Sequence, residues 1–369
     1  MNAQEGMVAS GAAERGLPSL APARTRRTGS RSKGLVRGRS ARALGLLVAC
    51  GALVLVCLLS LAIGSRSIPF ATVVDAFVDY DASNSNQVIV HSLRGPRTLL
   101  GLMVGVALAL SGAVMQGVTR NPLADPAILG VNAGAALAAA LAVLVLGVDS
   151  LFGYIWFAFA GAGIAALAVF AIGSLGRDGA TPVKLAIAGA AVTAFLTSVT
   201  TLIVLVDVET LNALRFWLVG SLAAPDSSVV SQVWPFILVG AAMALVSGRL
   251  LNALSLGDDV ARSLGQNVGR ARAFSGAAAI ILAGGATAAA GPIGLVGLTI
   301  PHVARAITGP DYRWILPYSA VLGGILLLGA DVLGRVVARP GELQVGIVTA
   351  VVGAPFFVAL VRRRKLAEL

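Results

Sequence analysis

The chain has 369 residues, of which 57% are hydrophobic and only 12% are charged. A soluble domain carries about 25% charged residues, so this composition excludes an ordinary soluble fold and predicts a polytopic helical membrane protein. The apolar runs are continuous and do not alternate, which argues against a β-barrel. The net charge of +11 does not indicate nucleic-acid binding, because many basic residues gather at the two chain ends.

The first 42 residues hold nine of the 28 lysines and arginines and show no apolar periodicity. We expect residues 1–42 to form a disordered, basic cytoplasmic tail, followed by a membrane domain at 43–365 and a short C-terminal end at 366–369. Ten apolar runs follow the tail, most of them close to the roughly 20 residues of a membrane span. They lie at 43–64, 95–118, 127–147, 151–175, 183–206, 229–248, 270–290, 294–308, 314–334 and 344–361.

The basic residues also orient these spans, because membrane proteins keep lysine and arginine on the cytoplasmic side. With the N-terminus inside, the internal segments and the two ends hold 22 of the 28 basic residues, and the external segments hold six. This asymmetry predicts a multi-pass protein of the bacterial cytoplasmic membrane with both termini inside.

Four segments between the spans carry further information. Residues 65–93 are predicted to form an external loop, and 207–227 an external stretch that is amphipathic enough for a short interfacial helix. Residues 249–272 form the longest internal loop, and 335–343 an external turn. Spans two to five and spans seven to ten are candidates for two structural repeats that cross the membrane in opposite orientations, because a single span separates them. Each set has a proline-containing break after its first span.

The stretch Asn121–Pro126 is a polar turn with two prolines between two long apolar runs. Proline cannot continue a helix. The stretch is therefore either an ordinary turn at the membrane face or a broken helix that lines a path. A second break falls at Gly291 and Pro292, and Pro301 and His302 lie within the short eighth span.

The internal loop has the pattern of a short helix. Asp258 and Asp259 stand where negative charge favours a helix N-terminus, and Gly265 can end the helix. Val260 and Leu264 are one turn apart on the same face. We predict an amphipathic helix of about two to three turns, which either docks another protein or packs on its own spans.

Several stretches in chain order resemble the patterns of the FecCD family, the permeases of iron–siderophore and cobalamin ABC importers. The resemblance covers about residues 44–365. The tail lies outside it, and Gln344 stands where the family more often has proline. The stretches are Arg94–Thr98, Gly105–Gln116, Arg120–Pro126, Leu254–Val268, Gly291–Arg305, Ala330–Arg335 and Glu342–Phe357.

This resemblance implies an all-helical permease of ten spans, a second permease subunit (identical or related), two cytoplasmic ATPases and an extracytoplasmic binding protein. The sequence contains no GxxxxGK[ST] motif, so ATP and Mg²⁺ are expected on the partner ATPase, and this chain is expected to be neither an enzyme nor a cofactor carrier. The segment implied to seat in the ATPase consists of Leu256, Gly257, Asp258, Asp259, Val260, Ala261, Arg262, Ser263, Leu264 and Gly265.

The resemblance also places Arg94, Arg97 and Arg335 where the family presents arginines to carboxylates of the binding protein. The planar guanidinium of arginine can bind a carboxylate through two parallel hydrogen bonds. The alternative is that each arginine only extends its charged end to the membrane surface or sets the topology of the chain. The path is expected to be uncharged and to lie between two permease subunits. Its candidates are Met115, Gln116, Asn121, Pro122, Asn132, Thr193, Thr197 and Thr200, although membrane threonines more often bond their own helix.

Other classes of function fit the sequence less well. Two cysteines and two histidines give no metal-ligand spacing, and His302 is predicted to be a packing residue. A secondary transporter needs carboxylates within its spans, where acids are nearly absent and Asp331 lies close to an outer end. An intramembrane enzyme would need a Ser/His or paired-Asp arrangement, and the predicted spans contain none at membrane depth. The cargo stays open between ferric siderophore, favoured by the family's usual use, and cobalamin or haem.

Overall fold

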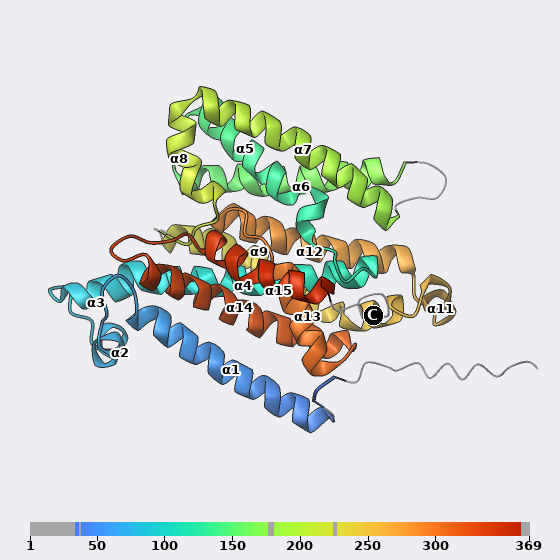
Figure 1. The fold of residues 1–369 in the computed structure, drawn as a ribbon, viewed down its shortest axis with the longest axis horizontal. Helices are drawn as coiled ribbons and strands as arrows, with labels where there is room; N and C mark the ends of the chain where they lie inside the picture. Colours follow the sequence, from blue (N-terminus) through green and yellow to red (C-terminus); the bar gives the residue numbers. More distant parts are fainter. Residues whose placement is uncertain (1–33, 37, 176–180, 224–226, 363–369) are drawn as a thin grey trace, which may run out of the picture. The chain divides into compact units, whose positions relative to one another are not determined.

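The computed structural model describes residues 34–36, 38–175, 181–223 and 227–362. Throughout these ranges every regular element is a helix and no strand occurs (Figure 1). The all-helical fold class predicted from the composition is therefore confirmed. Most of the predicted tail, at residues 1–33, and the predicted end at 366–369 lie outside the described residues.

Each of the ten predicted spans corresponds to one helix. Among the described residues, seven helical stretches are long and apolar enough to cross a membrane, whereas α5, α13 and α15 are shorter, so ten is an approximate count of spans. The ten helices are α1 (Arg39–Ala62), α4 (Gly95–Thr119), α5 (Val131–Leu146), α6 (Leu151–Gly173), α7 (Pro182–Val206), α9 (Ser227–Val246), α12 (Val268–Ala290), α13 (Val296–Thr308), α14 (Tyr312–Val337) and α15 (Val345–Arg362).

In the described part of the chain, seven shorter elements lie between these helices. The predicted short helix within 207–227 is present as α8, whereas the predicted loops at 65–93 and 249–272 are largely helical. Residues 39–42, assigned to the tail from the sequence, belong to α1. The short elements are α2 (Phe70–Val78), α3 (Ser85–Ile89), the π-helix η1 (Val90–Arg94), the 3₁₀ helix η2 (Pro126–Leu129), α8 (Val208–Leu218), α10 (Gly248–Leu254) and α11 (Asp258–Ser263).

Side-chain caps determine where several helices begin. Thr181, Asp207, Asn267 and Asp311 each accept a backbone N–H from the first turn of α7, α8, α12 and α14, respectively. Such bonds satisfy N–H groups that have no partner within a helix. All four are polar residues directly before a helix, so a local feature of the sequence marks each of these helix starts.

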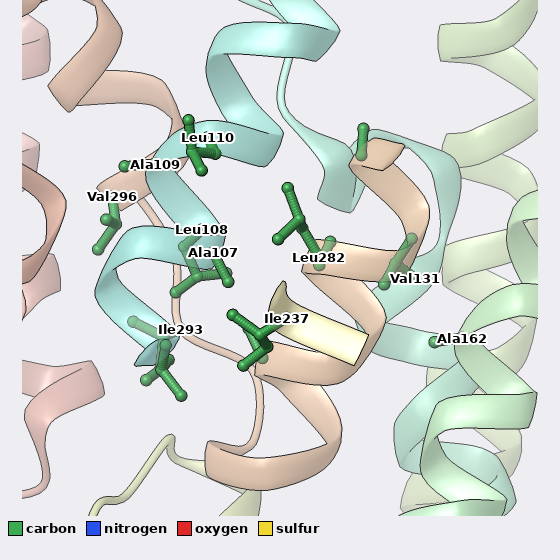
Figure 2. Close-up of a cluster of buried hydrophobic side chains, with 14 of the residues drawn as sticks. Ala107, Leu108, Ala109, Leu110, Val131, Ala162, Ile237, Leu282, Ile293 and Val296 are labelled. Carbon is green, nitrogen blue, oxygen red and sulfur yellow. The ribbon is translucent and has the colours of Figure 1, made fainter. Parts of the chain in front are cut away.

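α4 lies at the centre of the bundle, where it packs against α12, α13 and α14. Figure 2 shows part of this core, in which Leu108 of α4, Ile237 of α9 and Leu282 of α12 lie together. Gly105 of α4 faces the backbone of Gly323 on α14 so closely that a Cβ at either position would overlap the other helix. Small residues therefore allow the close helix approach expected in a membrane bundle.

A second group of helices, α5 to α8, packs on the other side of α12 (Figure 1). Within it, Gly134 of α5 and Gly161 of α6 approach so closely that neither position has room for a side chain. α7 contacts α5 and α6 along one side, but most of its remaining surface is exposed. The exposed side of α7 is therefore open to lipid or to a partner.

The two ends of the bundle are named here after the predicted topology. The end with α11 is the inner end, and the end with α2 and α3 is the outer end (Figure 1). At the inner end the N–H groups of Leu35 and Val36 donate to the carbonyls of Ala306 and Ile307, both at 3.0 Å. These bonds satisfy carbonyls at the end of α13 and bring the residues before α1 to that helix end.

Candidate functional site

The segment from Leu256 to Gly265 forms a knob at the inner end, beside α10 and the start of α12 (Figure 1). Gly257 (φ 103°) and Gly265 (φ 81°) bound it in conformations that L side chains rarely adopt. Asp258 and Asp259 lie in the first turn of α11, where negative charge is favourable. The structure thus contains the predicted short helix, although α11 has only six residues.

Three apolar side chains of this knob are exposed. Leu256, Val260 and Leu264 follow one another at intervals of four residues and are 60%, 45% and 65% exposed, while Ala261 is fully buried against the bundle. We call the three exposed side chains the α11 ridge. Exposed apolar side chains that are grouped in this way mark a protein or membrane interaction site.

The two neighbouring aspartates of α11 have different surroundings. The carboxylate of Asp258 contacts the guanidinium of Arg120, which follows α4, at 3.1 Å, and that of Arg272 on α12 at 2.9 Å. The side chain of Asp259 is almost fully exposed and forms an ion pair with Arg262 of the same helix at 3.0 Å. Only the first aspartate therefore connects the knob to the membrane helices.

A second set of contacts holds α10 to the start of α14. The amide of Asn252 donates to Asp311 at 2.6 Å and accepts the N–H of Tyr312 at 2.9 Å. Burial raises the pKa of the Asp311 carboxyl, but hydrogen bonds from Arg313 and Asn252 outweigh it, so this pKa lies below its usual value. A charged Asp311 thus anchors the internal loop.

The first proline-containing break consists of turns that side chains stabilise. Arg120 ends α4 in a left-handed conformation (φ 51°). The side chains of Asn121 and Asp125 each accept a hydrogen bond, at 2.9 Å, from the backbone N–H two residues further along the chain. Pro122, which follows Asn121, is half-buried, and Pro126 begins η2. Burial raises the pKa of Asp125, and the N–H that it accepts partly offsets this effect. Side-chain bonds of this kind stabilise turns wherever they lie, so they do not decide between the two alternatives left open by the sequence.

The second break needs glycine for a packing reason. Gly291 (φ 75°) is followed by Pro292, and a Cβ on Gly291 would overlap the carbonyl of Trp217. The chain then reaches Leu295, which adopts a left-handed conformation (φ 69°) and begins α13. Each of the two breaks therefore contains a residue with positive φ near a proline.

His302 follows Pro301 inside α13 and is buried. Its Nδ1 lies 2.8 Å from the carbonyl oxygen of Leu298, and its Nε2 has no hydrogen-bond partner. Among the residues that the structure describes, no group of three His, Cys, Asp or Glu could hold a metal ion. His302 is therefore packed inside the bundle with one hydrogen-bonded ring nitrogen, and its predicted packing and hydrogen-bonding role stays a prediction.

Arg94 at the outer end points into the bundle. Its side chain is 6% exposed, and its guanidinium donates to the carbonyls of Leu61 and Ala62, both at 2.8 Å, and to that of Arg66. The last carbonyl groups of a helix have no partner within it, so Arg94 caps the end of α1. The predicted presentation of Arg94 to an outside partner is not what this structure shows.

Arg335 is buried in the same way. Its guanidinium donates to the carbonyls of Ser60 and Ile63, both at 3.0 Å, and forms an ion pair with Asp331 at 3.0 Å. Asp331 also pairs with Arg97 at 2.7 Å. We call Arg97, Asp331 and Arg335 the outer cluster. The two Nη groups of Arg335 donate within the chain, and its Nε is buried without a hydrogen-bond partner, so the structure does not present this side chain to a partner either.

Arg97 lies nearest to the surface within the outer cluster, but only 12% of its side chain is exposed. Its second ion pair, at 2.6 Å, is with Glu342 on the turn before α15. The four-residue spacing of Asp331 and Arg335 on one helix is a signal that could have predicted their pairing. The pairing of Arg97 with Asp331 joins residues 234 positions apart, so no local spacing in the sequence could have predicted it.

An open groove of about 950 Å³ runs along α7 and η2. Thr193 and Thr197, predicted for the path, both line it. Ser198 and Thr201 also line it but were missed. The four-residue spacing of Thr193, Thr197 and Thr201 along one helix face could have indicated Thr201. The lining residues are small, apolar or hydroxyl-bearing, namely Ala127, Ile128, Ala186, Gly189, Ala190, Thr193, Ala194, Thr197, Ser198 and Thr201.

Other predicted path residues lie away from the groove. Met115 and Gln116 are buried in the packing of α4, and the Gln116 amide faces carbonyls of α13. Thr200 is buried and donates to a carbonyl of its own helix at 2.8 Å, while Asn132 accepts the hydroxyl of Thr287 at 2.9 Å. These side chains join or stabilise helices, so the structure brings together only part of the predicted path.

Comparisons with known proteins agree on one family. The model of the FecCD transport family matches residues 52–363. The iron(3+)-hydroxamate import system permease protein FhuB of Bacillus subtilis is 42% identical over 323 residues, which cover 87% of this chain and 84% of that protein. The ferric enterobactin transport system permease protein FepD of Escherichia coli is 44% identical over 312 residues, which cover 85% and 93%.

A solved structure of a metal-chelate type ABC transporter in an inward-facing conformation is also similar. It has a TM-score of 0.76 and 30% sequence identity, and the match covers 87% of this chain and 99% of that chain. The family match extends over most of the described helices, including α11 and the outer cluster. The chain belongs to the FecCD transport family.

Proposed function

We propose that this chain is the membrane-spanning permease subunit of an ATP-binding cassette importer that moves a ferric siderophore across the bacterial cytoplasmic membrane. The observation that carries the proposal is the α11 ridge, three exposed apolar side chains in and beside a short helix at the inner end of a FecCD-family membrane bundle. Such a surface needs a partner, because water disfavours grouped apolar side chains.

The partner at the inner end is a cytoplasmic ATPase. The α11 ridge seats in a cleft of that protein, which binds ATP and Mg²⁺ and hydrolyses ATP. The permease has no phosphate-binding loop of its own, so its role is to receive movement and not to perform the chemistry. Closure of two ATPase subunits then moves α11 and switches the permease between inward-open and outward-open states.

The groove on α7 is one wall of the transport path, and a second permease subunit, identical or related, supplies the opposite wall. None of the ten lining residues is charged, and most are alanine, glycine, serine or threonine. A large, rigid metal chelate passes best along a surface that holds it weakly. The exposure of α7 along the groove supports this arrangement, because a partner subunit would cover it.

An extracytoplasmic binding protein delivers the cargo at the outer end. Arg94 and Arg335 contribute there by holding the end of α1 in place. The ion pair of Arg97 with the partly exposed Glu342 extends from the buried cluster to the surface, and we propose it as the edge of the docking surface.

An ion-driven secondary transporter is the alternative from another class. It would need a carboxylate within the membrane that can gain and lose a cation. Asp331 is a carboxylate within α14, but two arginines neutralise it. This arrangement favours the ATP-driven mechanism.

The cargo is proposed from the names of two relatives, which refer to a ferric hydroxamate and to ferric enterobactin. The test is uptake of radiolabelled iron(III), bound to a hydroxamate, to a catecholate or to citrate, by cells with and without this gene. Loss of one chelate that the gene restores would support the proposal and identify the cargo. Unchanged iron uptake in cells without another iron importer, together with lost cobalamin or haem uptake, would contradict it.

A further inference from the structure

Asp258 has contacts that docking to an ATPase does not require. Its carboxylate forms ion pairs with the guanidinium groups of Arg120, which follows α4, and of Arg272 on α12. The side chain of Asp258 is 25% exposed, and those of the two arginines are 42% and 36% exposed. We call these three residues the Asp258 cluster. It lies at the edge of the membrane helices, partly shielded from solvent.

The helices that the cluster connects are packed against each other. α4 and α12 share a long contact, which includes a buried bond of 2.6 Å from the hydroxyl of Ser111 to the carbonyl of Ala279. α4 is the first helix of one predicted inverted half, and α12 is the first helix of the other. A displacement of α11 that passes through Asp258 would therefore reach both halves together.

The backbone fixes the position of the cluster. Gly257, directly before Asp258, has φ 103° and ψ 155°, a conformation that is essentially restricted to glycine. Arg120 itself is left-handed, which is unfavourable for a residue with a side chain. A Cβ on Gly257 would lie 3.9 Å from a guanidinium nitrogen of Arg120, so the end of the Arg120 side chain lies beside the turn at Gly257.

We infer that Asp258 is the positioning residue that transmits movement of α11 to α4 and α12, through its ion pairs with Arg120 and Arg272. The inference rests on the proposed function, because the ATPase supplies the movement. One carboxylate serves both arginines, so the two ion pairs act as a unit.

The test uses the complete transporter, with its ATPase and binding-protein partners, in lipid vesicles. Asp258→Asn is expected to reduce the stimulation of ATP hydrolysis by the binding protein about threefold to tenfold, the range for residues in a coupling network. The yield of assembled complex and its thermal midpoint should stay at the wild-type values. Asp258→Glu, which keeps the charge, should restore most of the stimulation.

Further variants test whether the two ion pairs of Asp258 act together and whether the effect is specific to them. The double variant Arg120→Gln/Arg272→Gln should resemble Asp258→Asn, and adding Asp258→Asn to it should cause no further loss. Arg270→Gln is the matched control, because Arg270 is an exposed arginine near Arg272 on α12 and forms no ion pair among the described residues. It should keep wild-type stimulation.

Several results would overturn the inference. These are wild-type stimulation in Asp258→Asn, additive losses in the triple variant, or a parallel fall in complex yield, which would mean that Asp258 only supports folding. Failure of the proposed function would look different. A wild-type transporter that hydrolyses ATP in response to its binding protein but accumulates no iron chelate would contradict the cargo, while the stimulation ratio would still test Asp258.

Discussion

The two ends of the bundle use arginine and aspartate in opposite ways. At the outer end, the side chains of Asp331 and Arg335 are 1% and 3% exposed and are surrounded by α1, α4 and α14. At the inner end, Asp258 is partly exposed, Asp259 is almost fully exposed, and both lie beside the exposed α11 ridge.

This difference separates stability from recognition. Buried charges hold helices together, because removing one partner leaves another charge in a medium that solvates it poorly. Exposed ion pairs contribute little to stability. In the proposed function, burial of the exposed apolar ridge beside them would provide the energy for binding the ATPase. A charged residue at a predicted membrane face therefore does not by itself mark a docking site.

Removal of Asp331 is expected to have the largest effect on stability. Asp331→Ala leaves Arg97 and Arg335 without their shared carboxylate, and it should lower the free energy of unfolding by about 3–5 kcal/mol. Denaturant unfolding of the purified permease in detergent measures this change. Glu342→Gln, which removes a partly exposed partner of Arg97, should cost clearly less. Wild-type stability of Asp331→Ala would show that the outer cluster does not hold the bundle.

Arg94→Gln tests whether this arginine caps a helix or contacts a partner. Two 2.8 Å bonds to carbonyls of α1 are lost. Because hydrogen bonds to charged groups contribute about 1.5–3 kcal/mol each, we expect a clear loss of stability. Affinity of the folded fraction for the binding protein, measured at low and high salt, should stay unchanged. A salt-dependent loss of affinity at wild-type stability would restore the docking role predicted from the sequence.

Leu264→Asp replaces an apolar side chain of the α11 ridge with a charged one. It should weaken ATPase binding by more than about tenfold, because burial of a leucine side chain contributes about 1.5–3 kcal/mol. The thermal midpoint of the permease should not change, since Leu264 is 65% exposed. Titration of the ATPase against permease in nanodiscs gives the affinity, with Leu264→Met as the conservative control. Unchanged affinity would remove the ridge from the interface.

Ala190→Trp places a large side chain in the groove on α7. Uptake of the iron chelate should fall to a small fraction of wild type, because the side chain narrows the path, while complex assembly and ATP hydrolysis persist. Leu202→Trp provides the control, since Leu202 is exposed on α7 but does not line the groove. Equal uptake by both variants would place the path elsewhere.

Asp259→Asn should have the smallest effect on stability. Its ion pair with Arg262 lies within one exposed helix turn, where water and salt screen the charges. We expect no measurable change in the thermal midpoint. A lowered midpoint would contradict the assignment of the inner charges to the surface and would weaken the contrast between the two ends.

The sequence by itself determined the helical fold, the approximate positions of the ten helices and the short helix at α11. These features depend on local information. A run of apolar residues specifies a membrane helix wherever it packs, because every backbone polar group must bond within the segment. Asp207, Asn267 and Asp311 cap helices through bonds to residues only two or three positions away.

The tertiary structure alone decided which charged and polar residues are buried and which are exposed. Arg97 and Asp331 meet although 234 positions separate them, and Arg335 bonds to a helix end 275 positions away. The same holds on α7, where Thr197 lines the groove and Thr200 is buried. Helix rotation and packing set the burial of each side chain, and they arise from contacts between segments that no local pattern in the sequence records.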